Sequence, residues 1–164
     1  MASLLRQVWV RPVSLAQVPS FTAAYPQFDA VLEYLVTEEE FLTAAWCMQY
    51  YAPLALPQPH PFQLVTYERL VCDGIQELVR LFQNWGIELP ESTSVWVEAP
   101  SMTTKRHSGL RRIADPLKGW RKALTDDQVR SILRVVEAFE LDFYSEDLEP
   151  DYQRLHDLSS VGAG

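Results

Sequence analysis

The chain has 164 residues, of which 48% are hydrophobic, so it is long and apolar enough to bury the core of one globular domain. Its formal net charge is -8 at pH 7, because 22 acidic residues outnumber 14 lysines and arginines. A surface of this sign repels polyanions at long range, which excludes general binding to nucleic acid or to anionic membranes.

The sequence contains no pattern typical of export, membrane insertion or metal binding. The first residues, MASLLRQVWVRP, hold an apolar stretch that is too short and too interrupted for a signal peptide, and no apolar run reaches the length of a membrane span. Cys47 and Cys72 lie in apolar patterns without the spacing of metal ligands, which indicates reduced, packed thiols. We therefore expect a soluble, cytoplasmic protein without a structural metal.

The first third of the chain predicts helices. A short helix is expected over residues 3–10, since a residue that precedes proline, here Arg11, is pushed out of the helical region. The stretch FDAVLEYLV, residues 28–36, places apolar side chains at helical intervals. Thr37 and Glu40 then form a capping-box pattern, which predicts the start of a further helix through EEFLTAAWCMQYY.

A strand followed by a helix is expected in the middle of the chain. Four prolines interrupt residues 53–61, and the apolar, β-branched run after them is typical of a buried strand at about residues 62–67. Asp73 is expected to cap the next helix and Gly86 to end it in a left-handed turn. A single buried strand leaves backbone groups unpaired, so its partner is either the segment STSVWVE or strands outside this chain.

The last third of the chain predicts one long helix between two irregular regions. Residues 88–120 show poor periodicity and are expected to be mostly loop. Thr125 and Gln128 repeat the capping-box pattern and predict an amphipathic helix to about Leu141. Residues 145–164 are acidic and are expected to form a loosely ordered tail.

One short stretch is strongly basic although the chain is acidic. Between Lys105 and Lys122, seven lysines and arginines stand against the single acid Asp115, a local balance of +6 that leaves -14 for the remainder. If this stretch folds onto one surface, it forms a focused anion site. A solvated basic loop is the alternative interpretation.

Two segments resemble the family of sulfotransferases that use PAPS (3'-phosphoadenylyl sulfate). In LVTYERLVCDGIQELVRLFQNWGI, the matches to the family's Tyr-Glu-x-Leu strand end and following helix are Tyr67, Glu68, Leu70, Leu78, Leu81, Phe82, Gly86 and Ile87. In DPLKGWRKALTDDQVRSILRVV, the matches to its Gly-x-Trp element, Leu-Thr pair and closing helix are Gly119, Trp120, Arg121, Leu124 and Thr125. Their order and separation fit the family, and the resemblance covers roughly residues 60–144.

The resemblance implies an α/β fold of the P-loop kinase-like kind, present here in incomplete form. Residues 1–164 would be a single domain similar to the C-terminal half of a sulfotransferase, predominantly helical with one or two short strands. It also implies a PAPS site. The residues that would contact the nucleotide are Ser3 and Tyr67, then Ser101, Thr103 and Thr104, and the basic residues Lys105, Arg106, Arg111 and Arg112.

The resemblance implies different roles for these residues at different parts of the nucleotide. Tyr67 would lie near the adenine, and the basic residues would close over the 3'-phosphate, because a guanidinium can hold a phosphate with two hydrogen bonds. The resemblance does not specify which of the arginines binds the 3'-phosphate. Ser3 would hold the 3'-phosphate at a helix start, and an ordinary N-cap serine is its alternative reading.

The family's phosphosulfate-binding loop and its catalytic base have no counterpart in the sequence. No G-x-x-x-x-G-K-[ST] run occurs, and no histidine occupies the position of the base, so no catalytic residue is assigned. We expect a protein that serves sulfuryl transfer from PAPS to a hydroxyl or amine acceptor but is inactive as this chain alone, with another chain supplying the missing half. If Met1 is the true start, unaided catalysis is not expected. The alternative is a non-catalytic helical interaction module or a truncated relative.

Overall fold

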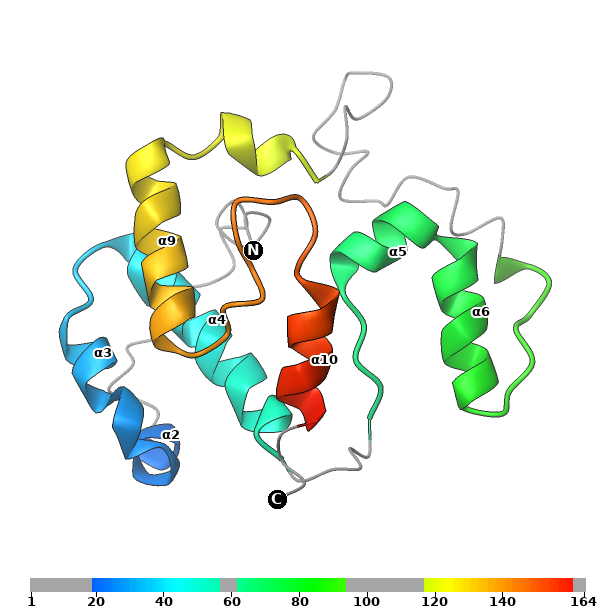
Figure 1. Cartoon of the computed structure of the whole chain (residues 1–164), viewed down its shortest axis with the longest axis horizontal. Helices are drawn as coiled ribbons and strands as arrows, with labels where there is room; N and C mark the ends of the chain where they lie inside the picture. Colours follow the sequence, from blue (N-terminus) through cyan, green and yellow to red (C-terminus); the bar gives the residue numbers. More distant parts are fainter. Residues whose placement is uncertain (1–18, 57–61, 94–116, 161–164) are drawn as a thin grey trace. The chain divides into compact units, whose positions relative to one another are not determined.

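The computed structural model describes residues 19–56, 62–93 and 117–160. This part of the chain is predominantly helical and contains no strand (Figure 1). It divides into two compact units, one made of residues 1–60 with 120–164 and the other of residues 61–119. Within the described ranges, no helix is long and apolar enough to cross a membrane. The expectation of a single domain over residues 1–164 stays a prediction.

The first unit holds most of the helices. Its elements in chain order are α2 (Pro19–Ala24), η2 (Pro26–Phe28), α3 (Asp29–Glu33), α4 (Glu38–Leu54), α9 (Asp126–Ala138) and α10 (Tyr152–Ser160), with η3 (Gly119–Lys122) at its boundary. The second unit holds α5 (Tyr67–Asp73) and α6 (Ile75–Asn84). The helices expected from FDAVLEYLV and from the two capping-box patterns are therefore present, whereas the one expected over residues 3–10 lies outside the described residues.

Both predicted capping boxes are confirmed. The Thr37 side chain accepts a hydrogen bond from the Glu40 backbone N–H, and the Glu40 carboxylate accepts one from the Thr37 N–H at 3.1 Å. Thr125 and Gln128 make the same reciprocal pair at the start of α9. Each pair satisfies backbone donors that the first turn of a helix leaves without intrahelical acceptors.

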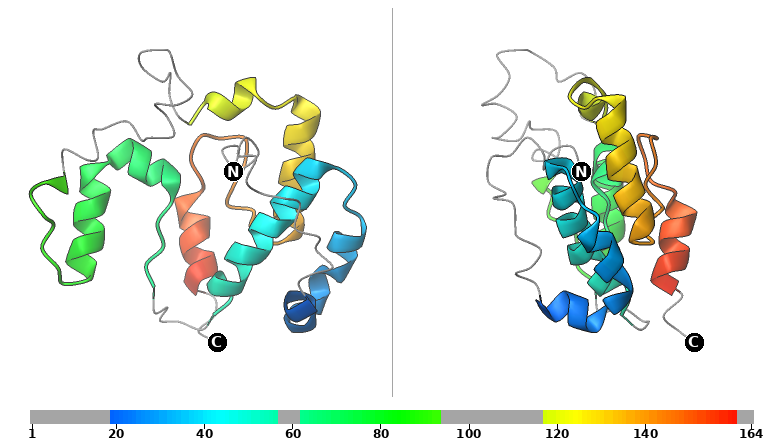
Figure 2. Two further views of the ribbon diagram at one scale, coloured as in Figure 1. Left: turned by 180° about the vertical axis from the view of Figure 1, so that it is seen from behind. Right: turned by 90° about the vertical axis from the view of Figure 1, so that its left-hand side faces the viewer.

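The core of the first unit forms where α4 packs against α9, which lie beside each other in Figures 1 and 2. Phe28 stacks on Phe139 with ring centroids 4.8 Å apart, and Tyr51 meets Phe28 edge-on at 4.6 Å. Phe21 adds a fourth ring to the same cluster. These rings come from α2, η2, α4 and the end of α9, so burial of aromatic surface joins elements more than 100 residues apart in the sequence.

A buried carboxylate joins the same two helices. Glu40 is only 2% exposed, and its Oε2 accepts hydrogen bonds from the backbone N–H groups of Val36 and Thr37. Its Oε1 accepts one from Arg134 on α9. The bond from Val36 contributes most to a lowered pKa for Glu40, and the bond from Thr37 and the Arg134 charge lower it further against the opposing effect of burial.

α9 ends in a left-handed turn that the sequence does not predict. Glu140 has φ 59°, its N–H donates to the carbonyl of Glu137 at 2.8 Å, and the N–H of Leu141 donates to that of Val136 at 3.1 Å. This pair of bonds is a Schellman motif, in which glycine is the usual residue at the left-handed position. The turn directs Leu141 and Phe143 back into the core.

The acidic segment expected to be a loosely ordered tail contains a helix. α10 spans Tyr152–Ser160 and buries Leu155. Arg154 donates two hydrogen bonds to the Asp142 carboxylate, one of them at 2.7 Å, and the Asp151 N–H donates to the carbonyl of Phe143 at 2.8 Å. Residues 161–164 lie outside the described part of the chain.

Three expectations are wrong. Residues 62–66 form no strand and α5 begins at Tyr67, because Thr66 caps a helix that the β-branched composition of the run conceals. Asp73 does not cap α6. It is the last residue of α5, and Gly74 with φ 51° separates the two helices. Cys72 is exposed rather than packed, whereas Cys47 is buried as expected. The segment STSVWVE lies mostly outside the described residues.

Replacement of Glu40 by alanine is expected to lower the free energy of unfolding by about 2 kcal/mol, because it removes the acceptor of two backbone donors and the charge opposite Arg134. Urea denaturation measures this loss. Glu38→Ala is the matched control, since Glu38 lies in the same first turn but is exposed. Equal losses for the two variants would contradict the role of Glu40.

Acid is expected to destabilise the first unit partly through Glu40. A carboxyl group with a lowered pKa in the folded state contributes stability above its unfolded pKa of about 4.3, and the contribution is lost as the pH falls through the folded value. Unfolding free energies of the wild type and of Glu40→Gln should therefore differ more at about pH 7 than at about pH 3. A difference that is independent of pH would count against this linkage.

Candidate nucleotide-binding site

Tyr67 is the one predicted site residue that the described part of the chain contains. It is the first residue of α5, and 58% of its surface is exposed. Thr66 precedes it in an extended conformation and accepts a hydrogen bond from the Arg69 N–H at 3.2 Å, which fixes the start of the helix. A ring held at a fixed backbone position with an open face can stack on a planar base.

The other predicted site residues lie outside the described ranges. They are Ser3, Ser101, Thr103, Thr104, Lys105, Arg106, Arg111 and Arg112. Whether they approach Tyr67 stays a prediction.

The helix that carries Tyr67, α5, is followed almost without interruption by α6. Gly74, with φ 51°, lies between α5 and α6. At the other end of α6, Gly86 has φ 67° and donates its N–H to the Gln83 carbonyl at 2.9 Å, while Ile87 donates to Phe82 at 3.0 Å. The predicted left-handed turn at Gly86 is therefore confirmed, again as a Schellman motif.

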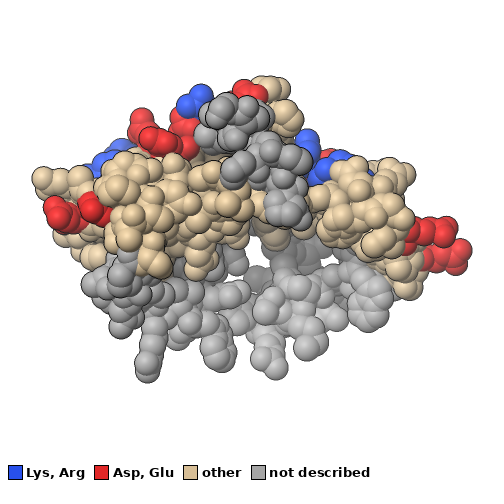
Figure 3. Space-filling view, turned by 90° about the horizontal axis from the view of Figure 1, so that it is seen from below, with Lys and Arg blue, Asp and Glu red and all other residues tan. Residues whose placement is uncertain are grey.

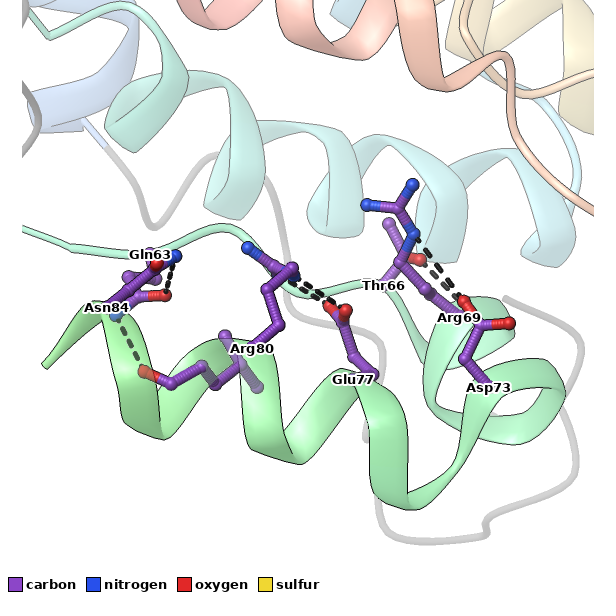
Figure 4. Close-up of polar contacts among 8 residues, drawn as sticks. Gln63, Thr66, Arg69, Asp73, Glu77, Arg80 and Asn84 are labelled. Atoms are coloured by element: carbon purple, nitrogen blue, oxygen red, sulfur yellow. Dashed lines mark hydrogen bonds and ion pairs between the residues drawn. The ribbon is translucent and has the colours of Figure 1, made fainter. Parts of the chain in front are cut away.

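A bidentate ion pair occupies one face of α6 (Figure 4). Arg80 donates to both carboxylate oxygens of Glu77, at 2.7 and 2.6 Å, and Glu77 is only 3% exposed. These hydrogen bonds are the main cause of the lowered pKa of Glu77 and of the raised pKa of Arg80. Glu77 therefore already uses the Nε and Nη2 donors of Arg80.

An amide pair ties the segment before α5 to the end of α6. Gln63 donates from Nε2 to the carbonyl of Leu81 at 3.2 Å, and its Oε1 accepts a hydrogen bond from Asn84 Nδ2 at 3.2 Å (Figure 4). The sequence analysis missed this contact, because two amide residues 21 positions apart carry no periodic signal. The Glu77–Arg80 pair, by contrast, has the i,i+3 spacing that charge patterning can detect.

Of the basic stretch, Lys118, Arg121 and Lys122 are among the described residues, and all are exposed. The Arg121 guanidinium lies 5.3 Å from the centroid of the Trp120 ring, and its Nη2 donates to the carbonyl of Glu146 at 2.7 Å. Arg121 therefore joins η3 to the acidic segment that precedes α10.

The described ranges contain no candidate metal site, and one of their two cysteines has a buried thiol. No group of three or more metal-ligating side chains could hold an ion there. Burial raises the pKa of the Cys47 thiol, which keeps it in the protonated, unreactive form.

Comparisons of the chain with protein-family models, with curated proteins and with solved structures found no match. A function must therefore be inferred from the residues of the chain and their geometry.

Loss of the Thr66 hydroxyl is expected to weaken the start of α5. Thr66→Ala should lower the free energy of unfolding by about 1 kcal/mol, whereas Thr66→Ser keeps the acceptor oxygen and should restore most of it. Urea denaturation, with amide hydrogen exchange at Arg69 as a local readout, measures both effects. If serine and alanine behave alike, the hydroxyl does not cap the helix.

Proposed function

We propose that this chain forms the adenosine-bisphosphate side of a PAPS site in a protein of the sulfotransferase class. Under this proposal the chain belongs to an α/β, P-loop kinase-like fold, and its own residues hold the adenine and the 3'-phosphate. The observation that carries the proposal is Tyr67, which is the first residue of the Tyr-Glu-x-Leu match and has 58% of its surface exposed.

The charges of the described arginines support the assignment of the phosphate-binding role to the basic stretch. Each described arginine already has an acidic or carbonyl partner: Arg69 with Asp73, Arg80 with Glu77, Arg121 with the Glu146 carbonyl, Arg130 with Asp127, Arg134 with Glu40 and Arg154 with Asp142. A phosphate that bound to one of them would compete with that partner for the guanidinium N–H donors. As the resemblance implies, we assign the 3'-phosphate to Lys105, Arg106, Arg111 and Arg112.

Sulfuryl transfer itself needs more than these residues provide. A hydroxyl or amine of the acceptor attacks the sulfur of PAPS, the sulfur–oxygen bond to the phosphate breaks, PAP (adenosine 3',5'-bisphosphate) leaves, and a base takes the acceptor proton. Positive charge around the phosphosulfate stabilises this in-line transition state. The sequence contains neither the phosphosulfate loop nor the base. Under the proposal both come from outside these 164 residues.

Titration of the purified chain with PAP by calorimetry tests the proposal. We expect saturable binding that weakens as salt is added, because phosphate contacts are electrostatic. Tyr67→Ala should weaken it about tenfold through lost stacking, and Arg111→Ala or Arg112→Ala by a similar factor through lost charge-assisted hydrogen bonds.

Two control variants separate these effects from general ones. Tyr34→Ala removes another exposed tyrosine, and Arg130→Ala removes an arginine on α9 that pairs with Asp127. Neither should change the affinity for PAP. Absence of PAP binding by the folded wild-type chain would refute the proposed nucleotide site.

Exposed apolar side chains favour a second candidate, a non-catalytic interaction module. Tyr34 and Val36 are 77% and 81% exposed in the first unit, and Trp85 and Ile87 are exposed in the second. On the face that Figure 3 shows, much of the described surface is uncharged. Chains that self-associate in light scattering without binding PAP would support this candidate. A stable monomer that binds PAP would exclude it.

A further inference from the structure

We infer that Gln63 is a positioning residue for Tyr67, an inference that rests on the proposed nucleotide site. Gln63 lies four residues before Tyr67, and its side chain makes hydrogen bonds to α6. Both ends of its amide are used, one as donor to Leu81 and the other as acceptor from Asn84 (Figure 4).

The inference follows from how the segment before α5 is held. Residues 63–66 belong to neither a helix nor a strand, so no ladder of backbone hydrogen bonds fixes them within the described structure. Two side chains take over this role: Thr66 caps α5, and Gln63 anchors the beginning of the segment. The Leu81 carbonyl lies in the last turn of α6 and also accepts a hydrogen bond from the Trp85 N–H at 3.2 Å, so the Gln63 amide is a second donor to this carbonyl.

The consequence for ligand binding is preorganisation. The backbone that leads into Tyr67 is held at both ends before any nucleotide arrives, so less conformational freedom is lost when a base stacks on the ring. If Gln63 is removed, the ring remains but its position is less defined, and part of the binding energy is used to order it.

Calorimetric titration with PAP of the variants Gln63→Ala and Asn84→Ala tests the inference. We expect Gln63→Ala to weaken binding about fivefold, the equivalent of one or two modest hydrogen bonds. Asn84→Ala should have a smaller effect, because the bond from Gln63 to Leu81 remains. Gln83→Ala is the matched control, since Gln83 is an exposed amide in the same turn of α6 and should bind PAP as the wild type does.

A double-mutant cycle separates positioning from general destabilisation. If Gln63 acts through Tyr67, Gln63→Ala should cause little further loss of affinity when Tyr67 is already alanine. Equal losses in both backgrounds, or no loss in either, would overturn the inference while leaving the proposed function intact. If the wild type does not bind PAP, the proposed function fails and the inference with it.

Hydrogen exchange of the chain without nucleotide provides a second measurement. The amides of Arg69 and Leu70 donate to Thr66, to its side chain and its carbonyl respectively, each at 3.2 Å. We expect both to exchange several-fold faster in Gln63→Ala than in Gln83→Ala, because the segment that ends at Thr66 opens more often. Unchanged exchange would show that Gln63 does not hold this segment, even if PAP binds.

Discussion

The first unit depends on the Glu40 carboxylate, which bonds both to the start of its own helix, α4, and to α9. Glu40 closes the N-terminal turn of α4 by accepting two backbone hydrogen bonds, and it also meets Arg134 on a helix that begins 86 residues later. A buried carboxylate without these donors would be strongly destabilising, so the helix cap and the pairing of α4 with α9 form together. The aromatic cluster of Phe21, Phe28, Tyr51 and Phe139 adds apolar contacts within the same unit.

The parts of the fold that local chemistry determines could be predicted from the sequence. Both capping boxes and the turn at Gly86 involve residues within a few positions of each other, so their signals survive in a single sequence. The segment before Tyr67 could not be predicted in this way. Its β-branched composition favours a strand, but helix α5 begins at Tyr67, where the Thr66 cap competes with that composition. The contact between Glu40 and Arg134 has no local signal at all.

The candidate site was only partly accessible to sequence reasoning. Tyr67 was found through its place in the Tyr-Glu-x-Leu pattern, and the structure adds that this residue is exposed at the start of a helix. The amide contacts of Gln63 were missed because glutamine and asparagine are common surface residues, whose meaning depends on which carbonyl or amide lies opposite. The assignment of the basic residues to the phosphate stays a prediction. The sequence shows that they are charged, but only the fold determines whether they meet at one ligand.

The two Schellman turns show how differently the chain treats the same backbone geometry. At the end of α6 the left-handed position is Gly86, which adopts it without steric cost. At the end of α9 it is Glu140, for which a left-handed conformation costs roughly 1 kcal/mol, an amount smaller than the gain from burying the leucine that follows it. The left-handed turn at the end of α9 therefore depends on the core: Glu140 keeps its conformation only while Leu141 is buried. We expect this turn and the core around Leu141 to unfold as one cooperative unit.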